Sequence, residues 1–173
     1  MCAPTVVADR TYHRPDGSAP MRRHSDAHHP TSVPMRLTDD EARARLAAHD
    51  HGTLCTVHAG RGADAVPVAY AVDDGHVGIA VDLVKPKSST RLQRERNLEA
   101  DPRATLLVDH WDRDDWARLW WVRAQLHFLG DATDRQEGLA ARLAQRYPQY
   151  RARPFARVLV LRIVGVSGWA ASG

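Results

Sequence analysis

The chain has 173 residues, a length typical of one domain with a single hydrophobic core. Apolar residues make up 43% of the chain and charged residues 26%, and every apolar run is shorter than the ~20 residues that a membrane-spanning helix needs. The net charge of +3 is small, so any anion-binding function must depend on where basic residues cluster. Cys2 and Cys55 are too few for a disulfide framework and indicate free thiols in a cytoplasmic protein.

Residues 1–34 differ from the rest of the chain. They contain five prolines and no sustained hydrophobic periodicity, and the apolar stretch 3–8 is shorter than the ~7–15 residues of a signal-peptide core. We predict that they form a disordered extension, and that residues 35–173 form the folded domain. Because the periodic pattern begins at Met35, a translation start assigned too far upstream is the alternative.

A first helix is predicted from Thr38 to about His49. Thr38 and Glu41 have the spacing of a capping box, in which each side chain accepts a hydrogen bond from the other residue's amide. Gly52 ends the helical pattern, and residues 53–57 have the composition of a strand.

Two apolar, β-branched runs, 64–72 and 76–81, predict an antiparallel hairpin. The intervening Asp73-Asp74-Gly75 suits a turn that requires positive φ. A short polar helix is then expected over residues 88–99, because Ser88, Ser89 and Thr90 offer hydroxyl caps at its start and Asp101-Pro102 ends the pattern.

The second half of the chain predicts strands at 104–111 and 117–129. A helix is expected from the capping box at Thr133 until Pro148, followed by a last strand at 156–166. Six mainly antiparallel strands that do not alternate with full-length crossover helices predict a mainly β fold. We expect a six-stranded Greek-key barrel with a few short helices.

Basic side chains concentrate between residues 85 and 96. Hydroxyls, free amides and the positive end of a helix form a natural anion site, and arginine binds phosphate in a bidentate manner. A solvated basic helix face is the alternative. The residues concerned are Lys85, Lys87, Arg91, Arg94 and Arg96, with Ser88, Ser89 and Thr90.

The order of motifs around this segment is specific. A hairpin ending in Ala80-Val81-Asp82, the basic helix, and Asn97-Leu98-x-x-Asp101-Pro102-Arg103-Ala104 leading into a strand resemble the cofactor-binding core of the FMN-binding split-barrel superfamily of pyridoxamine 5'-phosphate oxidase-like proteins. Leu119-Trp120-Trp121-Val122-Arg123, Arg146-Tyr147-Pro148-Gln149-Tyr150 and Ser167-Gly168-Trp169 are similar to recurring blocks of its F420-dependent oxidoreductases. The resemblance covers residues 36–172 and implies the split-barrel fold.

The resemblance also implies a cofactor site shared by two chains of a homodimer. Residues of the second strand would face the ring of coenzyme F420, or alternatively of FMN, and the basic helix with its preceding loop would hold the phosphate. The implied cofactor-binding residues are Pro67, Val68, Ala69, Asp82, Lys85, Lys87, Ser88, Ser89, Thr90, Arg91, Arg94, Arg96, Asn97, Trp111, Trp116, Trp120 and Trp169. The implied activity is hydride transfer to a small unsaturated or quinone-like acceptor.

Two departures separate this chain from the FMN-dependent pyridoxine-phosphate oxidases. Oxidases of pyridoxine phosphate carry an FMN-binding arginine in the second strand, whereas Pro67-Val68-Ala69-Tyr70 has no cation here, and their C-terminal arginine and histidine motif is missing. The phosphodiester and polyglutamate tail of F420 suit an extended basic run. We therefore do not expect oxidation of pyridoxine phosphate.

No catalytic side chain is assigned, because a deazaflavin itself supplies the hydride. The proton donor to the acceptor is left open between Tyr70, His110 and solvent. The adjacent Trp120 and Trp121 should point to opposite faces of a strand.

The alternatives are an FMN-dependent flavoprotein and a non-catalytic flavin or haem carrier. Binding to nucleic acid is disfavoured, because only one helix is basic and few aromatic residues lie beside it. The pairs His28-His29 and His49-x-His51 lack the spacing of a closed zinc site, so no metal is expected.

Overall fold

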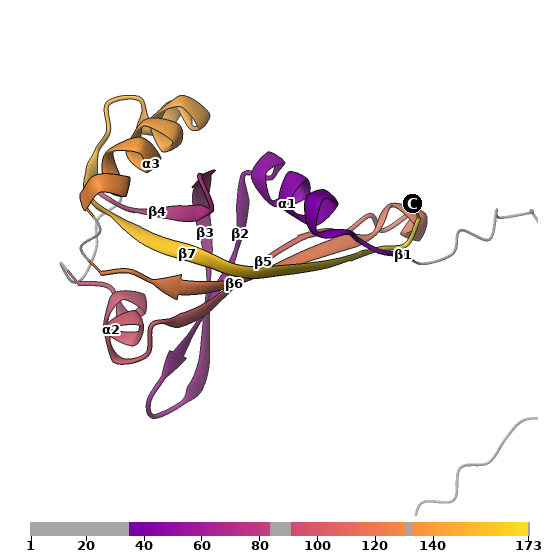
Figure 1. Ribbon diagram of the computed structural model, residues 1–173, viewed down its shortest axis with the longest axis horizontal. Helices are drawn as coiled ribbons and strands as arrows, with labels where there is room; N and C mark the ends of the chain where they lie inside the picture. Colours follow the sequence, from indigo (N-terminus) through magenta and orange to yellow (C-terminus); the bar gives the residue numbers. More distant parts are fainter. Residues whose placement is uncertain (1–34, 84–90, 131–132, 173) are drawn as a thin grey trace, which may run out of the picture. The chain divides into compact units, whose positions relative to one another are not determined.

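The computed structural model describes residues 35–83, 91–130 and 133–172 (Figure 1). The extension predicted over 1–34 lies outside the described residues, as do five of the residues implied in cofactor binding. These five are Lys85, Lys87, Ser88, Ser89 and Thr90.

Strands make up most of the described chain. In chain order the elements are β1 (Met35–Arg36), α1 (Asp39–Ala48), β2 (His51–His58), β3 (Gly62–Asp73), β4 (His76–Asp82), α2 (Gln93–Ala100), β5 (Arg103–His110), the 3₁₀ turn η1 (Trp116–Arg118), β6 (Trp120–Phe128), α3 (Thr133–Arg146), the 3₁₀ turn η2 (Pro148–Tyr150) and β7 (Phe155–Ala170).

The strands form one antiparallel sheet in the order β1-β7-β4-β3-β2-β5-β6, and an additional pairing of β6 with β7 closes it. The predicted mainly β split-barrel fold is confirmed. The described residues contain seven strands where six were predicted, because the two-residue β1 is too short to give a periodic signal.

Local sequence signals correctly predicted α1 and the β3–β4 turn. The Glu41 amide donates to Thr38 Oγ1 at 3.3 Å, and the Thr38 amide donates to Glu41 Oε2 at 2.8 Å, which completes the capping box. Asp74 and Gly75 both have positive φ, as the turn requires.

The start of α2 was predicted incorrectly. This helix begins at Gln93 rather than near Ser88, and residues 88–90 lie outside the described residues. At the start of the helix, the Leu92 amide donates to Glu95 Oε2 at 2.7 Å. Glu95 is buried, and its carboxylate takes over the capping role from within the first turn.

Two strand boundaries also differ from the prediction. The strand predicted at 117–129 begins at Trp120, because the Ala117 amide donates to Asp115 Oδ1 and starts η1. The last strand continues past Val166 to Ala170, because its polar and small residues pair with β6.

The hydrophobic core has two parts. Inside the barrel, inward-facing residues of the strands pack with Leu46 of α1 and Leu98 of α2. A second cluster lies where α3 packs on β3, β4 and β7, with Leu139 and Leu143 against Ala80 and Val160. Figure 1 shows α3 and α2 on different sides of the strands.

The strands β3 and β4 separate after a short shared segment. Their pairing runs from Asp73↔His76 to Tyr70↔Ile79. Beyond it, β4 pairs with β7 up to Asp82, while β3 pairs with β2 down to Gly62 (Figure 1). This divergence is the split of the barrel.

The close packing of α3 on β4 depends on a glycine. A Cβ atom at Gly78 would lie 2.7 Å from the Cβ of Leu139. We therefore expect Gly78→Ala to lower the free energy of unfolding by about 1–3 kcal/mol, as overpacking does. Urea unfolding monitored by circular dichroism measures the change.

Gly60→Ala is the matched control. Its added Cβ would meet nothing closer than 3.6 Å, so its free energy of unfolding should stay within about 1 kcal/mol of the wild-type value or rise. Equal stabilities of the two variants would contradict the packing of α3 described above.

Candidate cofactor site

The split leaves one edge of β3 without a neighbouring strand among the described residues. Pro67, Val68 and Ala69 pair with Thr53, Gly52 and His51 of β2, and none of the three pairs with β4. Val68 faces the core, whereas Pro67 is exposed. The backbone that the resemblance assigns to the cofactor ring therefore borders the split.

Arg94 of α2 turns toward the β4 side of the split. Its Nη2 donates to the Ala80 carbonyl at 3.5 Å, and its buried Nε has no hydrogen-bond partner among the described residues. Burial lowers the pKa of the Arg94 guanidinium. A buried guanidinium donor without a partner is what an anionic ligand would satisfy.

Asp82 and Tyr150 lie beside Arg94. The Tyr150 hydroxyl donates to Asp82 Oδ2 at 3.1 Å, and burial, followed by the charge of Asp82, raises the pKa of Tyr150 to about 12. Tyr150 therefore stays protonated at neutral pH and keeps Asp82 oriented. Tyr150 was not identified from the sequence, because its contact with β4 comes from the tertiary fold.

Arg91, just before α2, and Arg96 on the helix are both exposed. Arg91 forms an ion pair with Glu99, and Arg96 donates to Gln93 Oε1 and to the Arg91 carbonyl, both at 3.1 Å. The structure thus directs Arg94 toward β4 and leaves the other two guanidiniums on the surface.

Asn97 fastens α2 to the β2–β3 hairpin. Its Nδ2 donates to Thr56 Oγ1 at 2.9 Å and to Asp64 Oδ2 at 3.1 Å, and its Oδ1 accepts from Gln93 Nε2 at 2.9 Å. The side chain is buried. Its amide is engaged within the chain, which gives this residue a positioning role.

An ion pair between a buried carboxylate and an exposed arginine fixes the other side of α2. Glu95 is 4% exposed, and one of its carboxylate oxygens contacts the guanidinium of Arg157 on β7. Together with Asn97, this pair holds α2 between the two diverging halves of the sheet. No local sequence pattern indicates this pair, because its partners are 62 residues apart.

The tryptophans implied in cofactor binding are not gathered on one surface. Trp120 packs against the barrel core, whereas Trp169 stands opposite Trp121 in the β6–β7 pairing and so lies on the other face. Arg123 lies over the Trp121 ring at 5.7 Å, which confirms that Trp120 and Trp121 point to opposite faces.

Trp111 and Trp116 belong to the connection between β5 and β6. Their side chains are 59% and 65% exposed, and their ring centroids lie 5.5 Å apart. They therefore form an exposed aromatic pair.

Tyr70 is excluded as the proton donor to the acceptor. Its side chain is fully buried, its hydroxyl donates to the Leu46 carbonyl at 2.6 Å, and burial raises its pKa. His110 stacks on Trp120 with ring centroids 6.2 Å apart.

A groove of about 630 Å³ lies on the outward face of the sheet. It is bordered by β2, β3, β5, β6 and β7 and includes Cys55, Val57, Ala63, Thr105, Gln125 and Val164. In the described part of the chain no three His, Cys, Asp or Glu residues are placed to hold a metal. None of the described helices has the length and apolarity to cross a membrane.

Comparisons with solved structures find the same fold. A FAD-binding protein from Mesorhizobium loti matches with a TM-score of 0.56 and 20% identity over 80% of this chain and 96% of that one. A conserved hypothetical protein from Mycobacterium tuberculosis gives 0.60 and 20%, over 83% and 89% of the two chains. A heme binding protein from Mycobacterium smegmatis gives 0.57 and 20%, over 76% and 52%.

A search of curated proteins found no match. The family model described as pyridoxamine 5'-phosphate oxidase matches residues 38–170, which include every described element from α1 to β7. This chain therefore belongs to the pyridoxamine 5'-phosphate oxidase family, within the flavin-binding split-barrel oxidoreductase superfamily.

Proposed function

We propose that the chain is an F420-dependent oxidoreductase that reduces a small unsaturated or quinone-like acceptor. The observation that carries this proposal is that a buried guanidinium nitrogen and an open strand edge both lie at the split. Arg94 has a buried Nε without a partner among the described residues, and the nearby edge of β3 at Pro67–Ala69 has no neighbouring strand there.

The charges around α2 suit an elongated anionic cofactor. Arg94, with Lys85 and Lys87 of the preceding segment, would hold the phosphodiester, and the exposed Arg91 and Arg96 would meet the carboxylates of the polyglutamate tail. FMN has a single phosphate and no such tail. The strand that borders the ring carries no cation for an FMN phosphate.

When bound, coenzyme F420 supplies the hydride. The residues of this chain would bind the anionic part through α2 and orient the ring along Pro67, Val68 and Ala69. Asn97 and Glu95 maintain this arrangement by fixing α2 between β2 and β7. Specificity for F420 therefore depends on where α2 places its arginines.

We infer that two copies of the chain assemble through the outward face of the sheet. Val57, Leu107 and Val164 expose apolar side chains there, around the groove. Two of the residues implied in cofactor binding, Asp82 and Trp120, also lie at opposite ends of β7. Asp82 pairs with β7 near the start of that strand, and Trp120 pairs with it at the end. This strand has 16 residues, or ~50 Å of path at ~3.3 Å per residue.

This separation supports a shared site. A second copy of the chain would bring its own Trp111 and Trp116 to a cofactor anchored at Arg94. A homodimer with the cofactor at the interface satisfies both the apolar face and the separated site residues.

Arg94→Gln tests the cofactor assignment. Removing a charge-assisted hydrogen bond of about 1.5–3 kcal/mol should weaken F420 binding by about 10- to 100-fold. Quenching of tryptophan fluorescence during titration with F420 measures the affinity, with FMN, FAD and haem titrated in parallel.

Arg43→Gln is the matched control, because Arg43 pairs with Asp39 on the exposed surface of α1. Its affinity for F420 should equal that of the wild type, and both variants should keep the wild-type circular dichroism spectrum. Tighter binding of FMN, FAD or haem than of F420 would overturn the proposal, as would an unchanged affinity of Arg94→Gln.

Val164→Glu tests the assembly, because it places a charge on an exposed apolar position beside the groove. Light scattering should give twice the chain mass for the wild type and a single chain mass for the variant. Ala44→Glu, on the exposed side of α1, should remain dimeric. A wild type that remains monomeric in this measurement would contradict the shared site.

A further inference from the structure

His51 lies beside the strand that borders the split. It is the first residue of β2 and stands directly opposite Ala69 of β3 in the strand register. Cross-strand neighbours have Cβ atoms about 4.5–5.5 Å apart. The His51 side chain is 73% exposed, so a ligand held along Pro67–Ala69 has access to its imidazole.

Asp50 fixes the orientation and tautomer of this imidazole. His51 Nδ1 lies 2.9 Å from Asp50 Oδ1, and this hydrogen bond is the main cause of the lowered pKa of Asp50. The ionised carboxylate accepts a hydrogen bond from Nδ1, so Nε2 remains for a ligand.

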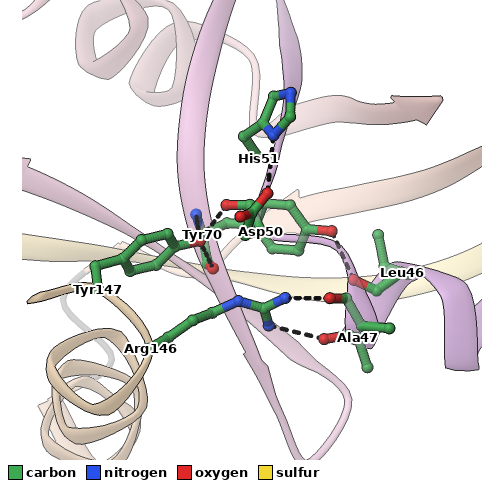
Figure 2. Close-up of polar contacts among 8 residues, drawn as sticks. Leu46, Ala47, Asp50, His51, Tyr70, Arg146 and Tyr147 are labelled. Carbon is green, nitrogen blue, oxygen red and sulfur yellow. Dashed lines mark hydrogen bonds and ion pairs between the residues drawn. The ribbon is translucent and has the colours of Figure 1, made fainter. Parts of the chain in front are cut away.

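The backbone at Asp50 is held by Tyr147, the residue that follows α3 (Figure 2). The Tyr147 hydroxyl contacts the Asp50 carbonyl and lies 2.7 Å from the Tyr70 carbonyl. It also accepts a hydrogen bond from the Tyr70 amide at 3.2 Å. Asp50 is thereby fixed relative to β3, the strand on which the proposed ring would lie.

The end of α1 is held by the same two elements. Tyr70 donates its hydroxyl proton to the Leu46 carbonyl, and Arg146 donates to the carbonyls of Ala47 and Ala48 at 2.7 and 2.6 Å (Figure 2). These bonds satisfy carbonyls that a helix end otherwise leaves unpaired. They also hold rigid the segment that carries the Asp50–His51 pair.

The charged and titratable groups around His51 come from α1, β5 and the segment between α1 and β2. The His49 ring lies 5.4 Å from the His51 ring and 5.2 Å from that of Trp120. Burial, followed by the charge of His51, lowers the pKa of His49, so this imidazole is kept neutral. Asp109 and His110 of β5 and Arg45 of α1 complete the charged surroundings.

We propose that His51, oriented by Asp50, donates the proton that completes reduction of a conjugated carbonyl acceptor. This inference rests on the proposed function. The acceptor gains a hydride from the reduced cofactor at its electron-poor carbon, and the electron pair of the C=C bond moves to its carbonyl oxygen. The Nε2–H of the His51 imidazolium gives that oxygen a proton, which leaves a neutral imidazole whose Nδ1–H stays bonded to Asp50. The enol then becomes the saturated carbonyl.

The acceptor gains one hydride, which carries two electrons, and one proton, while the cofactor loses that hydride. The neutral imidazole regains its proton from solvent. Tyr70 does not compete for this role, because its hydroxyl is buried and bonded to Leu46.

The first test needs no cofactor. Cyclohex-2-en-1-one is titrated into ¹⁵N-labelled protein while the imidazole nitrogens are followed by NMR. The His51 Nε2 signal should shift on addition of the enone, and Asp50→Asn should weaken this response. An unmoved His51 signal in the wild type would overturn the proposal, whatever cofactor the protein binds.

The second test is kinetic and uses protein loaded with reduced F420. His51→Gln should lower kcat for cyclohex-2-en-1-one by about 10²–10⁴-fold, while the affinity for F420 stays unchanged. His76→Gln, in the β3–β4 hairpin, should match the wild type. A wild-type kcat for His51→Gln would refute the proton-donor role.

Failure of the wild type to bind F420 would instead refute the proposed function, and the NMR test would still decide whether His51 contacts the enone.

Discussion

Tyr70 holds the point at which β3 and β4 separate. Among the residues of β3 that pair with β4, Tyr70 is the farthest from the hairpin turn. Its amide and carbonyl contact the Tyr147 hydroxyl, and its own hydroxyl donates to the Leu46 carbonyl. One buried side chain thus ties the opening of the barrel to α1 and α3. Because these polar groups are satisfied inside the protein, the divergence of the strands is fixed before any ligand binds.

The divergence determines how the candidate site is built. It gives α2 a position between two halves of the sheet, where Asn97 bonds to the β2–β3 hairpin and Glu95 contacts Arg157 of β7. Once α2 is fixed on both sides, Arg94 is directed inward toward β4. The same divergence leaves Pro67–Ala69 with strand pairing on one edge, so a cationic group and an open strand edge border one split.

Features set by a few adjacent residues could be predicted from the sequence. The capping box at Thr38 and the positive-φ turn at Asp74 are local, and both were predicted correctly. The start of α2 was not, because the helix begins at Gln93, where the buried carboxylate of Glu95 in the first turn accepts a hydrogen bond from the Leu92 amide. The network around Asp50 joins residues 24 to 99 positions apart and leaves no local pattern. The roles of β3 and α2 in cofactor binding stay predictions that come from the family resemblance.

A crystal structure of the protein with coenzyme F420 bound tests the central claim most directly. The account predicts that the deazaflavin ring lies along Pro67, Val68 and Ala69, with Arg94 on the phosphodiester and a second copy of the chain contributing to the same site. A cofactor bound away from the split between β3 and β4, or a well-ordered F420 that leaves Arg94 without an anionic partner, would contradict it.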